Sequence, residues 1–329
     1  MIYYSEQLFR PQGISCMKCH APESGYTFEG SGISALVMSG TKLGHPKVAR
    51  NSQSVAYTAA MLPNQHYSQR SESNISFFWD GRAVSLEEQA VEPLYSLHEM
   101  NVGSKINLCA RVMSGLYSSQ ILEFFPKRKV TCKVDANKVE AIVLSALAAF
   151  QTSKVVNRYS SKFDRFNLGE IRLSETEQQG LDVFLGAGRC VICHTMFPSK
   201  APLFSDFSYH NIEIPTNTEL ELIWQRVFSF KPDKDSGRCS ISRVERDCGA
   251  FKTPTLRNVT KKPFEGFERR YGHNGKYSNV ADVIRNHVYP AYIYDDYSIG
   301  AMIPNIVGDS LSKSELDALV AFLKTLEDR

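Results

Sequence analysis

Hydrophobic positions recur with the 3.6-residue period of an amphipathic helix in two long segments. In residues 135–150, one face carries Val139, Ile142, Val143, Leu147 and Phe150. In residues 312–326, the corresponding face carries Leu316, Leu319, Val320 and Leu323. This spacing is typical of a helix that packs one side against a core. Each half of the chain is therefore predicted to end with a packed helix.

Three Ser-x-x-Glu sequences predict where helices begin. They are Ser312–Glu315, Ser174–Glu177 and Ser85–Glu88. In such a capping box the serine side chain accepts from the glutamate N–H, and the glutamate side chain returns to the serine N–H. Alternating strand patterns are scarce along the chain. The sequence therefore predicts a mostly α fold with long loops.

Residues 278–290 place a histidine on the apolar face of another short helix. Ser278 is the predicted N-cap and Pro290 lies just beyond the predicted end. His287 shares its face with Val280, Val283 and Ile284. Taken alone, His287 is best interpreted as a core histidine with one hydrogen-bond partner.

The composition narrows the class of protein. The 329 residues are 43% hydrophobic and 22% charged, which is typical of a globular chain long enough for two domains. A net charge of +3 gives no indication of nucleic-acid binding. No apolar run is long enough to predict a transmembrane segment. We place the domain boundary in the polar stretch 157–170, which gives domains 1–165 and 166–329.

Eight cysteines carry much of the chemical information. Four of them form Cys16-x-x-Cys19-His20 and Cys190-x-x-Cys193-His194. The other four, Cys109, Cys132, Cys239 and Cys248, allow three disulfide pairings. We favour the local pairs because short loops close most readily, with four buried free thiols as the alternative. Disulfides would place the chain in an oxidising compartment.

Each Cys-x-x-Cys-His sequence is the attachment signature of a c-type haem. The two thiols can add to the two vinyl groups of one porphyrin, and the adjoining His20 or His194 can then ligate the iron. Four thiolates could alternatively bind zinc. Zinc does not need a histidine after each pair, however, and Cys19 and Cys190 are too far apart for a usual zinc ribbon. The sequence therefore predicts two covalently attached haems.

Five segments around the haem motifs occur in the order of a known family. They are 77–100 (FFWDGRAVSLEEQAVEPLYSLHEM), 145–151 (SALAAFQ), 160–170 (SSKFDRFNLGE), 251–259 (FKTPTLRNV) and 272–275 (GHNG). With them, nearly the whole chain resembles the bacterial dihaem cytochrome c peroxidases and their relatives, including MauG. The resemblance implies two cytochrome c-like domains, an N-terminal one with a peroxidatic haem and a C-terminal one with an electron-transfer haem.

The resemblance assigns roles to Glu99 and Trp79. Glu99 matches the family's distal glutamate. Such a carboxylate can take the proton from the near oxygen of H2O2 and return it to the departing oxygen, so that water leaves. Trp79 matches the tryptophan between the two haems, where an indole can carry electrons; a plain core tryptophan is the other interpretation. Gly188 stands where MauG has the tryptophan that relays oxidation to a protein substrate, which argues against that route.

Two further matches concern His45 and Asn51. His45 lies roughly where the peroxidases have a mobile distal ligand of the N-terminal haem; a solvent-exposed loop histidine is the alternative. Asn51 matches a residue near the family's interdomain calcium ion, with Thr260 and Pro263 as candidate partners. The segment between LRNV and HNG is longer than usual in the family, so these partners and the calcium stay open.

In this family, the second axial ligand of the C-terminal haem lies 14 residues after the histidine of the HNG-like motif. Counting from His273 gives His287, where classical peroxidases have methionine and MauG has tyrosine. The alternatives are Met302, Tyr292 and Tyr294. A second imidazole lowers the iron potential relative to a thioether. We therefore expect a lower-potential electron donor, or direct reaction of the diferric protein with peroxide.

The leading function is a dihaem peroxidase that reduces H2O2 to water at the N-terminal haem. A MauG-like oxidase of a protein or organic substrate and a plain dihaem electron carrier are the alternatives. The expected partners are H2O2 and a small donor protein, such as a c-type cytochrome or cupredoxin, or else a protein substrate. A homodimer is a further expectation. Residues 1–13 show no signal peptide, so for a periplasmic protein we expect the leader to have been removed.

Overall fold

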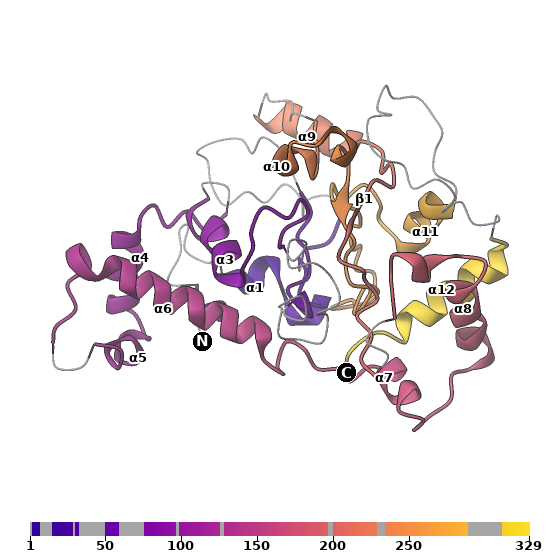
Figure 1. The fold of residues 1–329 in the computed structure, drawn as a ribbon, viewed down its shortest axis with the longest axis horizontal. Coiled ribbons are helices and arrows are strands. Elements are labelled where there is room, and N and C mark those ends of the chain that lie inside the picture. Colours follow the sequence, from indigo (N-terminus) through magenta and orange to yellow (C-terminus); the bar gives the residue numbers. More distant parts are fainter. Residues whose placement is uncertain are drawn as a thin grey trace.

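The computed structural model describes residues 2–6, 15–28, 30–32, 50–58, 76–96, 99–125, 128–196, 200–228, 234–288 and 311–329. The elements of the first half are η1 (Ile2–Tyr4), α1 (Cys16–Cys19), η2 (Pro22–Ser24), α3 (Leu86–Tyr95), α4 (Lys105–Ser114), α5 (Ser118–Leu122) and α6 (Cys132–Thr152). Those of the second half are α7 (Lys162–Asn167), α8 (Glu175–Leu185), η5 (Cys190–Ile192), β1 (Tyr209–His210), α9 (Thr218–Phe228), α10 (Cys239–Ser242), η6 (Glu245–Asp247), β2 (Phe251–Lys252), α11 (Val280–Val288) and α12 (Lys313–Lys324). The mostly α fold class is confirmed (Figure 1).

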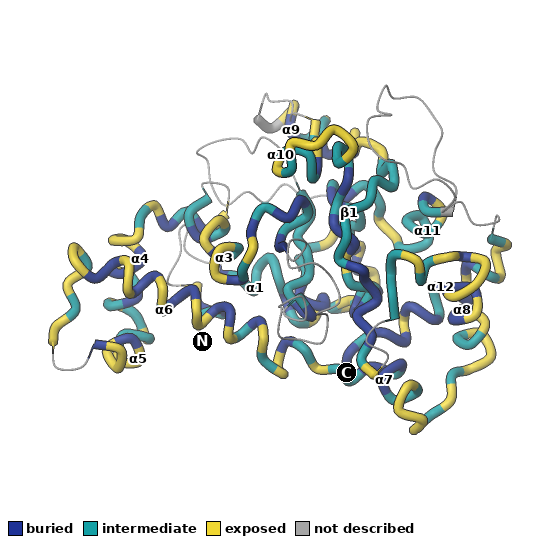
Figure 2. Tube along the Cα trace, viewed as in Figure 1, coloured by how far each residue is buried: buried dark blue, intermediate teal, exposed yellow. Residues whose placement is uncertain are grey.

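The first hydrophobic core lies where α3 and α4 pack on the long helix α6, at one end of the molecule (Figure 1). The face of α6 that the sequence predicts is the buried one, with Val139 and Val143 fully enclosed and Ile142 and Phe150 partly buried. Along α6 in Figure 2, buried and exposed positions alternate, as expected for an amphipathic helix. The partly buried Cys16 and Met17 of the first haem motif pack against the same core.

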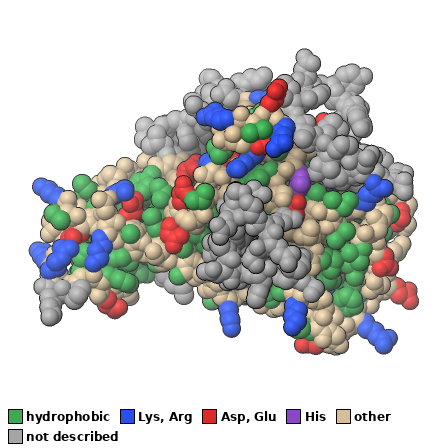
Figure 3. Space-filling model, in the orientation of Figure 1, with side chains coloured by type: hydrophobic (Ala, Val, Ile, Leu, Met, Phe, Trp, Pro, Cys, Tyr) green, Lys and Arg blue, Asp and Glu red, His purple; other side chains and the backbone are tan. Residues whose placement is uncertain are grey.

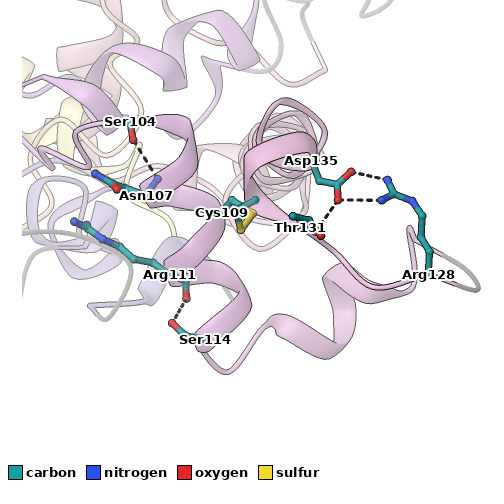
Figure 4. The surroundings of a disulfide bond; sticks show 9 residues. Ser104, Asn107, Cys109, Arg111, Ser114, Arg128, Thr131 and Asp135 are labelled. Atoms are coloured by element: carbon teal, nitrogen blue, oxygen red, sulfur yellow. Dashed lines mark hydrogen bonds and ion pairs between the residues drawn. A yellow bond between two sulfur atoms is a disulfide. The ribbon is translucent and has the colours of Figure 1, made fainter.

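Both predicted local disulfides are present. Cys109–Cys132 joins α4 to the first residue of α6 (Figure 4), and Cys239–Cys248 closes the loop around α10. Beside the first disulfide, Arg128 and the backbone N–H of Thr131 both donate to Asp135. A covalent link and a charged hydrogen-bond cluster therefore fix the start of α6 together.

The second core brings α7, α8 and α12 together at the opposite end of the molecule (Figure 1). Its aromatic centre consists of Phe163, Phe184, Phe204 and Phe322. Helices α8 and α12 approach closely at Gly180, where an added Cβ would lie 2.0 Å from the carbonyl oxygen of Ala318. The predicted boundary at residue 165 falls inside α7, which packs with this second core. The two-domain division stays a prediction.

The capping boxes are confirmed at Ser174 and Ser312, where both reciprocal hydrogen bonds are present. At Ser85 the prediction is half right. Its side chain accepts from the Glu88 N–H as predicted. The Glu88 carboxylate, however, accepts from the N–H of Val84, the residue before Ser85, and not from the Ser85 N–H. At α11 the predicted cap is wrong. The residue directly before the helix, Asn279, accepts from the Asp282 N–H, so Asn279 and not Ser278 is the N-cap.

Several polar contacts join the two halves of the chain. Arg50 binds Asp235 through two hydrogen bonds of 2.6 and 2.8 Å, and Asp80 through a third of 2.7 Å. The Asn51 N–H donates to the His273 carbonyl at 2.7 Å. In the described part of the chain, no helix is long and apolar enough to cross a membrane. Hydrophobic side chains are nevertheless exposed over the α4–α6 end, among Lys and Arg (Figure 3).

Candidate dihaem site

The first haem motif begins on the short helix α1 and ends with His20 directly after it. The His20 ring is held through Nδ1, which lies 3.3 Å from the carbonyl of Tyr26 and 3.2 Å from the hydroxyl of Ser52. The same hydroxyl donates to the Cys19 carbonyl at 2.6 Å. Burial lowers the pKa of His20, which favours the neutral imidazole that binds metals.

The four cysteines of the two motifs form no disulfide, whereas the other four are paired in disulfides. Cys16, Cys19, Cys190 and Cys193 are all partly buried. Two thiols at each motif are thus available for thioether bonds, and the adjoining histidine is present at each. The residues fit the covalent attachment of one haem at each motif, as the sequence predicts.

Glu99 lies close enough to Cys16 for the two side chains to interact electrostatically. It follows α3 in a turn in which the Glu99 N–H donates to the Ser96 carbonyl at 3.2 Å. Glu99 is exposed at the surface, yet enough protein surrounds its carboxyl group for desolvation to be the largest effect on its pKa. Desolvation, with the negative charge of Glu92 added, raises the pKa of Glu99 to about 7. The carboxyl group can therefore both accept and donate a proton near neutral pH.

Trp79 connects the two halves of the chain. Its indole Nε1 donates to the carbonyl of Asn51 at 2.8 Å, and its own carbonyl accepts the Lys252 N–H of β2 at 2.8 Å. Because the Asn51 N–H in turn donates to the carbonyl of His273, a short hydrogen-bonded path runs from Trp79 to the GHNG segment. Trp79 is partly buried at this contact between the halves.

Gly81 explains how the chain turns sharply after Trp79. Its φ is +75°, a conformation that L side chains rarely adopt. An added Cβ would also lie 1.9 Å from the hydroxyl oxygen of Tyr209 and 2.6 Å from a guanidinium nitrogen of Arg238. Only glycine fits this position, and its small size lets the FWDGR segment pack closely against Tyr209 and Arg238 of the second half of the chain.

The second haem motif lies on η5, and its histidine faces the helix α11. The ring centres of His194 and His287 are 6.4 Å apart. Each ring is held through Nδ1, by the carbonyl of Phe204 at 2.9 Å for His194 and by the carbonyl of Val283 at 2.8 Å for His287. In both rings this leaves Nε2 as the nitrogen for a metal. Burial, with the nearby His287, lowers the pKa of His194 to about 4.

His194 and His287 are the residues that could hold one iron between them, each through Nε2. The local pattern and the count from His273 therefore select a residue that the fold places opposite His194. Ligation by His287 itself stays a prediction. The alternatives Met302, Tyr292 and Tyr294, and Pro290, lie outside the described residues.

The N-terminal capping ligand and the calcium ion also stay predictions. His45 lies outside the described residues. The side-chain amide of Asn51 donates to the carbonyls of Arg270 and Gly272. Thr260 donates to Glu327, which follows α12. Asn51 and Thr260 thus have other hydrogen-bond partners in this structure, and nothing further supports the ion.

Cys193, Asp206 and His210 form a cluster whose ligand atoms all lie within 4.8 Å of one another. Burial is the largest single effect and disfavours the charged imidazole of His210, but the hydrogen bonds and negative charges of Asp206, at 2.8 Å, and Cys193 together outweigh it and raise the pKa to about 10. The thiol of Cys193 belongs to the second Cys-x-x-Cys-His motif, where haem attachment would consume it. We therefore interpret this cluster as part of the surroundings of the second haem.

A buried ion pair joins the segments 160–170 and 251–259, which stand out in the sequence only because they resemble family segments. Arg257 of the FKTPTLRNV segment donates to both carboxylate oxygens of Asp164, at 2.7 and 3.0 Å. The Arg257 side chain is fully buried. The two residues are far apart in the sequence, and no spacing rule predicts such a pair. Its effect is to tie α7 to the loop that precedes the GHNG segment.

A family model described as di-haem cytochrome c peroxidase matches residues 1–172. MauG of Paracoccus denitrificans is 28% identical, covering all of this chain and 87% of that protein. Cytochrome c551 peroxidase of Nitrosomonas europaea is 26% identical, covering 99% of this chain and 78% of that protein. The crystal structure of the diheme peroxidase BthA from Burkholderia thailandensis has a TM-score of 0.76 at 23% identity, over 99% of this chain and 84% of that one.

A mostly helical chain with two Cys-x-x-Cys-His motifs has the architecture of a dihaem protein of the cytochrome c type. Because the matching family model covers more than half of its residues, the chain belongs to the di-haem cytochrome c peroxidase family. This membership implies two c-type haems. Its relatives include both peroxidases and MauG proteins.

Proposed function

We propose that this protein is a dihaem peroxidase that reduces H2O2 to water at the N-terminal haem, with electrons passed from a bis-histidine C-terminal haem. The observation that carries the proposal is Glu99, held in the turn after α3 within electrostatic range of Cys16 and with a pKa of about 7. A carboxyl group that exchanges its proton at neutral pH is what peroxide cleavage requires on the open side of a haem.

One H2O2, two protons and two electrons give two waters. A bound haem would supply electrons and a site for peroxide. The Glu99 carboxylate would accept a proton from one oxygen of H2O2 and donate it to the other, so that water and not hydroxide leaves. His20 would hold the iron, through a ring fixed by Tyr26 and Ser52.

Trp79 is proposed to carry electrons between the haems. Its indole is fixed by Asn51, and its backbone is joined to β2 of the second half. His194 and His287 would hold the C-terminal iron. Two imidazoles lower its potential relative to a histidine–methionine pair. We propose a small periplasmic donor of matching potential, a c-type cytochrome or cupredoxin.

The test is steady-state peroxide turnover by the haem-loaded protein with a reduced small cytochrome. Glu99→Gln should lower turnover by about 100-fold or more, the usual contribution of a positioned acid–base group, while both haems stay attached. Glu87→Gln is the matched control, because Glu87 is exposed on α3, and it should leave turnover unchanged. Substantial activity of Glu99→Gln would remove Glu99 from the mechanism.

A MauG-like oxidase is the second candidate, because MauG proteins are among the relatives and position 287 is not methionine. Gly188 counts against the same relay route. An added Cβ there would lie 2.9 Å from the Val183 carbonyl and 3.2 Å from the Cys190 sulfur, so the position has no room for a tryptophan. Fast reaction of the diferric protein with H2O2 together with poor turnover with cytochromes would favour the oxidase.

A further inference from the structure

We propose that the ion pair between Arg82 and Glu92 controls the proton on Glu99, which makes Arg82 and Glu92 positioning residues for the peroxide reaction. The catalytic consequence rests on the proposed function of Glu99. The ion pair itself, and its position relative to Glu99, rest on the geometry of α3 and of the segment 77–83.

The chain folds back on the end of α3 and brings Glu99 next to the last helical turn. The Glu99 N–H donates to Ser96, the Met100 N–H to Pro93 at 3.0 Å, and the Val102 N–H to Leu94 at 3.0 Å. The Ser96 N–H caps the same turn by donating to the carbonyl of Glu92 at 2.8 Å. Glu92 and Glu99 therefore belong to one compact turn.

Arg82 reaches this turn from the FWDGR segment, which the isolated bridge between Phe77 and Ala83 closes. Its guanidinium donates to both carboxylate oxygens of Glu92, at 2.7 and 2.9 Å. A third hydrogen bond of 2.9 Å goes to Asp80. The guanidinium also lies 3.6 Å from the ring centre of Phe78. Four contacts thus hold this cation in one place. Arginine can make them all because its guanidinium is planar, donates to two carboxylate oxygens at once and stacks on an aromatic ring, which a lysine ammonium cannot do.

The groups that act on Glu99 come from three elements. Glu92 on α3 raises its pKa, while Arg82 of the 77–83 segment and the Ser96 hydroxyl at the end of α3 lower it, in addition to the larger effect of desolvation. The fourth neighbour, Cys16, comes from the third element, α1. In the haem-loaded protein its sulfur is a thioether and carries no charge. Arg82 and Glu92 are therefore the paired opposite charges that bias Glu99.

The opposite charges of Arg82 and Glu92 make it possible to separate an electrostatic role from a purely structural one. Arg82→Gln and Glu92→Gln both break the same ion pair, so a purely structural role predicts the same effect from both. Their charges act on Glu99 in opposite directions. Loss of the cation should raise the pKa of Glu99, and loss of the anion should lower it. The double variant removes both charges and should return the pKa close to that of the unaltered protein.

The measurement is an infrared pH titration of the haem-loaded protein, following the protonated-carboxyl band that Glu99→Gln removes. Arg82→Gln should shift the midpoint up and Glu92→Gln should shift it down, each by roughly 0.5–1 pH unit, since both charges are partly exposed. Arg82→Lys keeps the positive charge but cannot make all of the guanidinium contacts, so its midpoint should lie between those of the unaltered protein and Arg82→Gln. The two shifts should shrink at high salt. Shifts of the same sign, or no shift in either single variant, would overturn the proposal.

Peroxide turnover, followed over the same pH range, separates this inference from the proposed function. Opposite infrared shifts in proteins that do not turn over peroxide would support the ion-pair control and refute the peroxidase. Peroxide turnover whose pH profile is the same in all variants, with an unmoved infrared midpoint, would support the peroxidase and refute the ion-pair control.

Discussion

Glu99 is the residue whose surroundings bear most directly on the proposed chemistry. It is the ionised carboxylate that accepts the first proton, so the rate of reaction with H2O2 should depend on the fraction ionised. Because the pKa is about 7, the rate should be highest above neutrality and should fall about tenfold for each pH unit well below 7. Stopped-flow mixing of the protein with peroxide between pH 5 and pH 9 tests this. A rate constant that is flat over this range would contradict the assignment.

At the same scale, the sequence predicts single residues well when a motif or a count fixes them. The haem motifs place Cys16 and Cys190, and the count from His273 selects a histidine that the fold brings opposite His194. The sequence gives no indication of the contacts between Arg82, Glu92 and Glu99. These contacts depend on how the turn after α3 folds back against a loop, which neither spacing nor periodicity describes.

The helix α11 shows what element-level patterns can and cannot predict. Apolar periodicity predicts the helix and its inward face, but Asn279 displaces Ser278 as the cap by one residue. Serine and asparagine are equally good caps, so local preference alone cannot choose between neighbours. The α3 box fails in a similar way, because Val84 offers its N–H to Glu88 one residue before the predicted partner.

The two neighbouring residues at α11 provide a prediction with its own control. Asn279→Ala removes the side chain that accepts the Asp282 N–H and should destabilise the protein by about 1 kcal/mol, seen as a lower unfolding midpoint in denaturant. Ser278→Ala should change the midpoint little, because Ser278 is exposed and precedes the cap. If Ser278→Ala were the more destabilising variant, the cap would be misassigned.

At the scale of the whole molecule, contacts between the halves surround the residue proposed to carry electrons. Arg50 binds Asp235 of the second half and also Asp80, the neighbour of Trp79. The sequence predicts two halves with a haem each, but it cannot predict which charges meet between them. The partners are 185 residues apart in the case of Arg50 and Asp235.

Loss of the contact between Arg50 and Asp235 should destabilise the association of the two halves of the chain. Asp235→Asn weakens two charged hydrogen bonds between partly buried groups, so we expect a loss of about 2 kcal/mol in unfolding free energy. Glu219→Gln is the matched control, since the Glu219–Arg270 pair has an exposed carboxylate and should contribute below about 1 kcal/mol. Denaturant unfolding of the haem-loaded variants measures both. Equal losses would mean that the Arg50 contact is an ordinary surface pair.

Our central proposal is that a low-potential bis-histidine haem supplies electrons to the peroxidatic haem. A spectroelectrochemical titration of the intact protein and of His287→Met tests it most directly. We expect a C-terminal haem potential well below that of histidine–methionine cytochromes in the unaltered protein, and a clear upward shift in His287→Met as a thioether replaces the imidazole. A C-terminal potential in the range of histidine–methionine cytochromes, unchanged by His287→Met, would contradict the account.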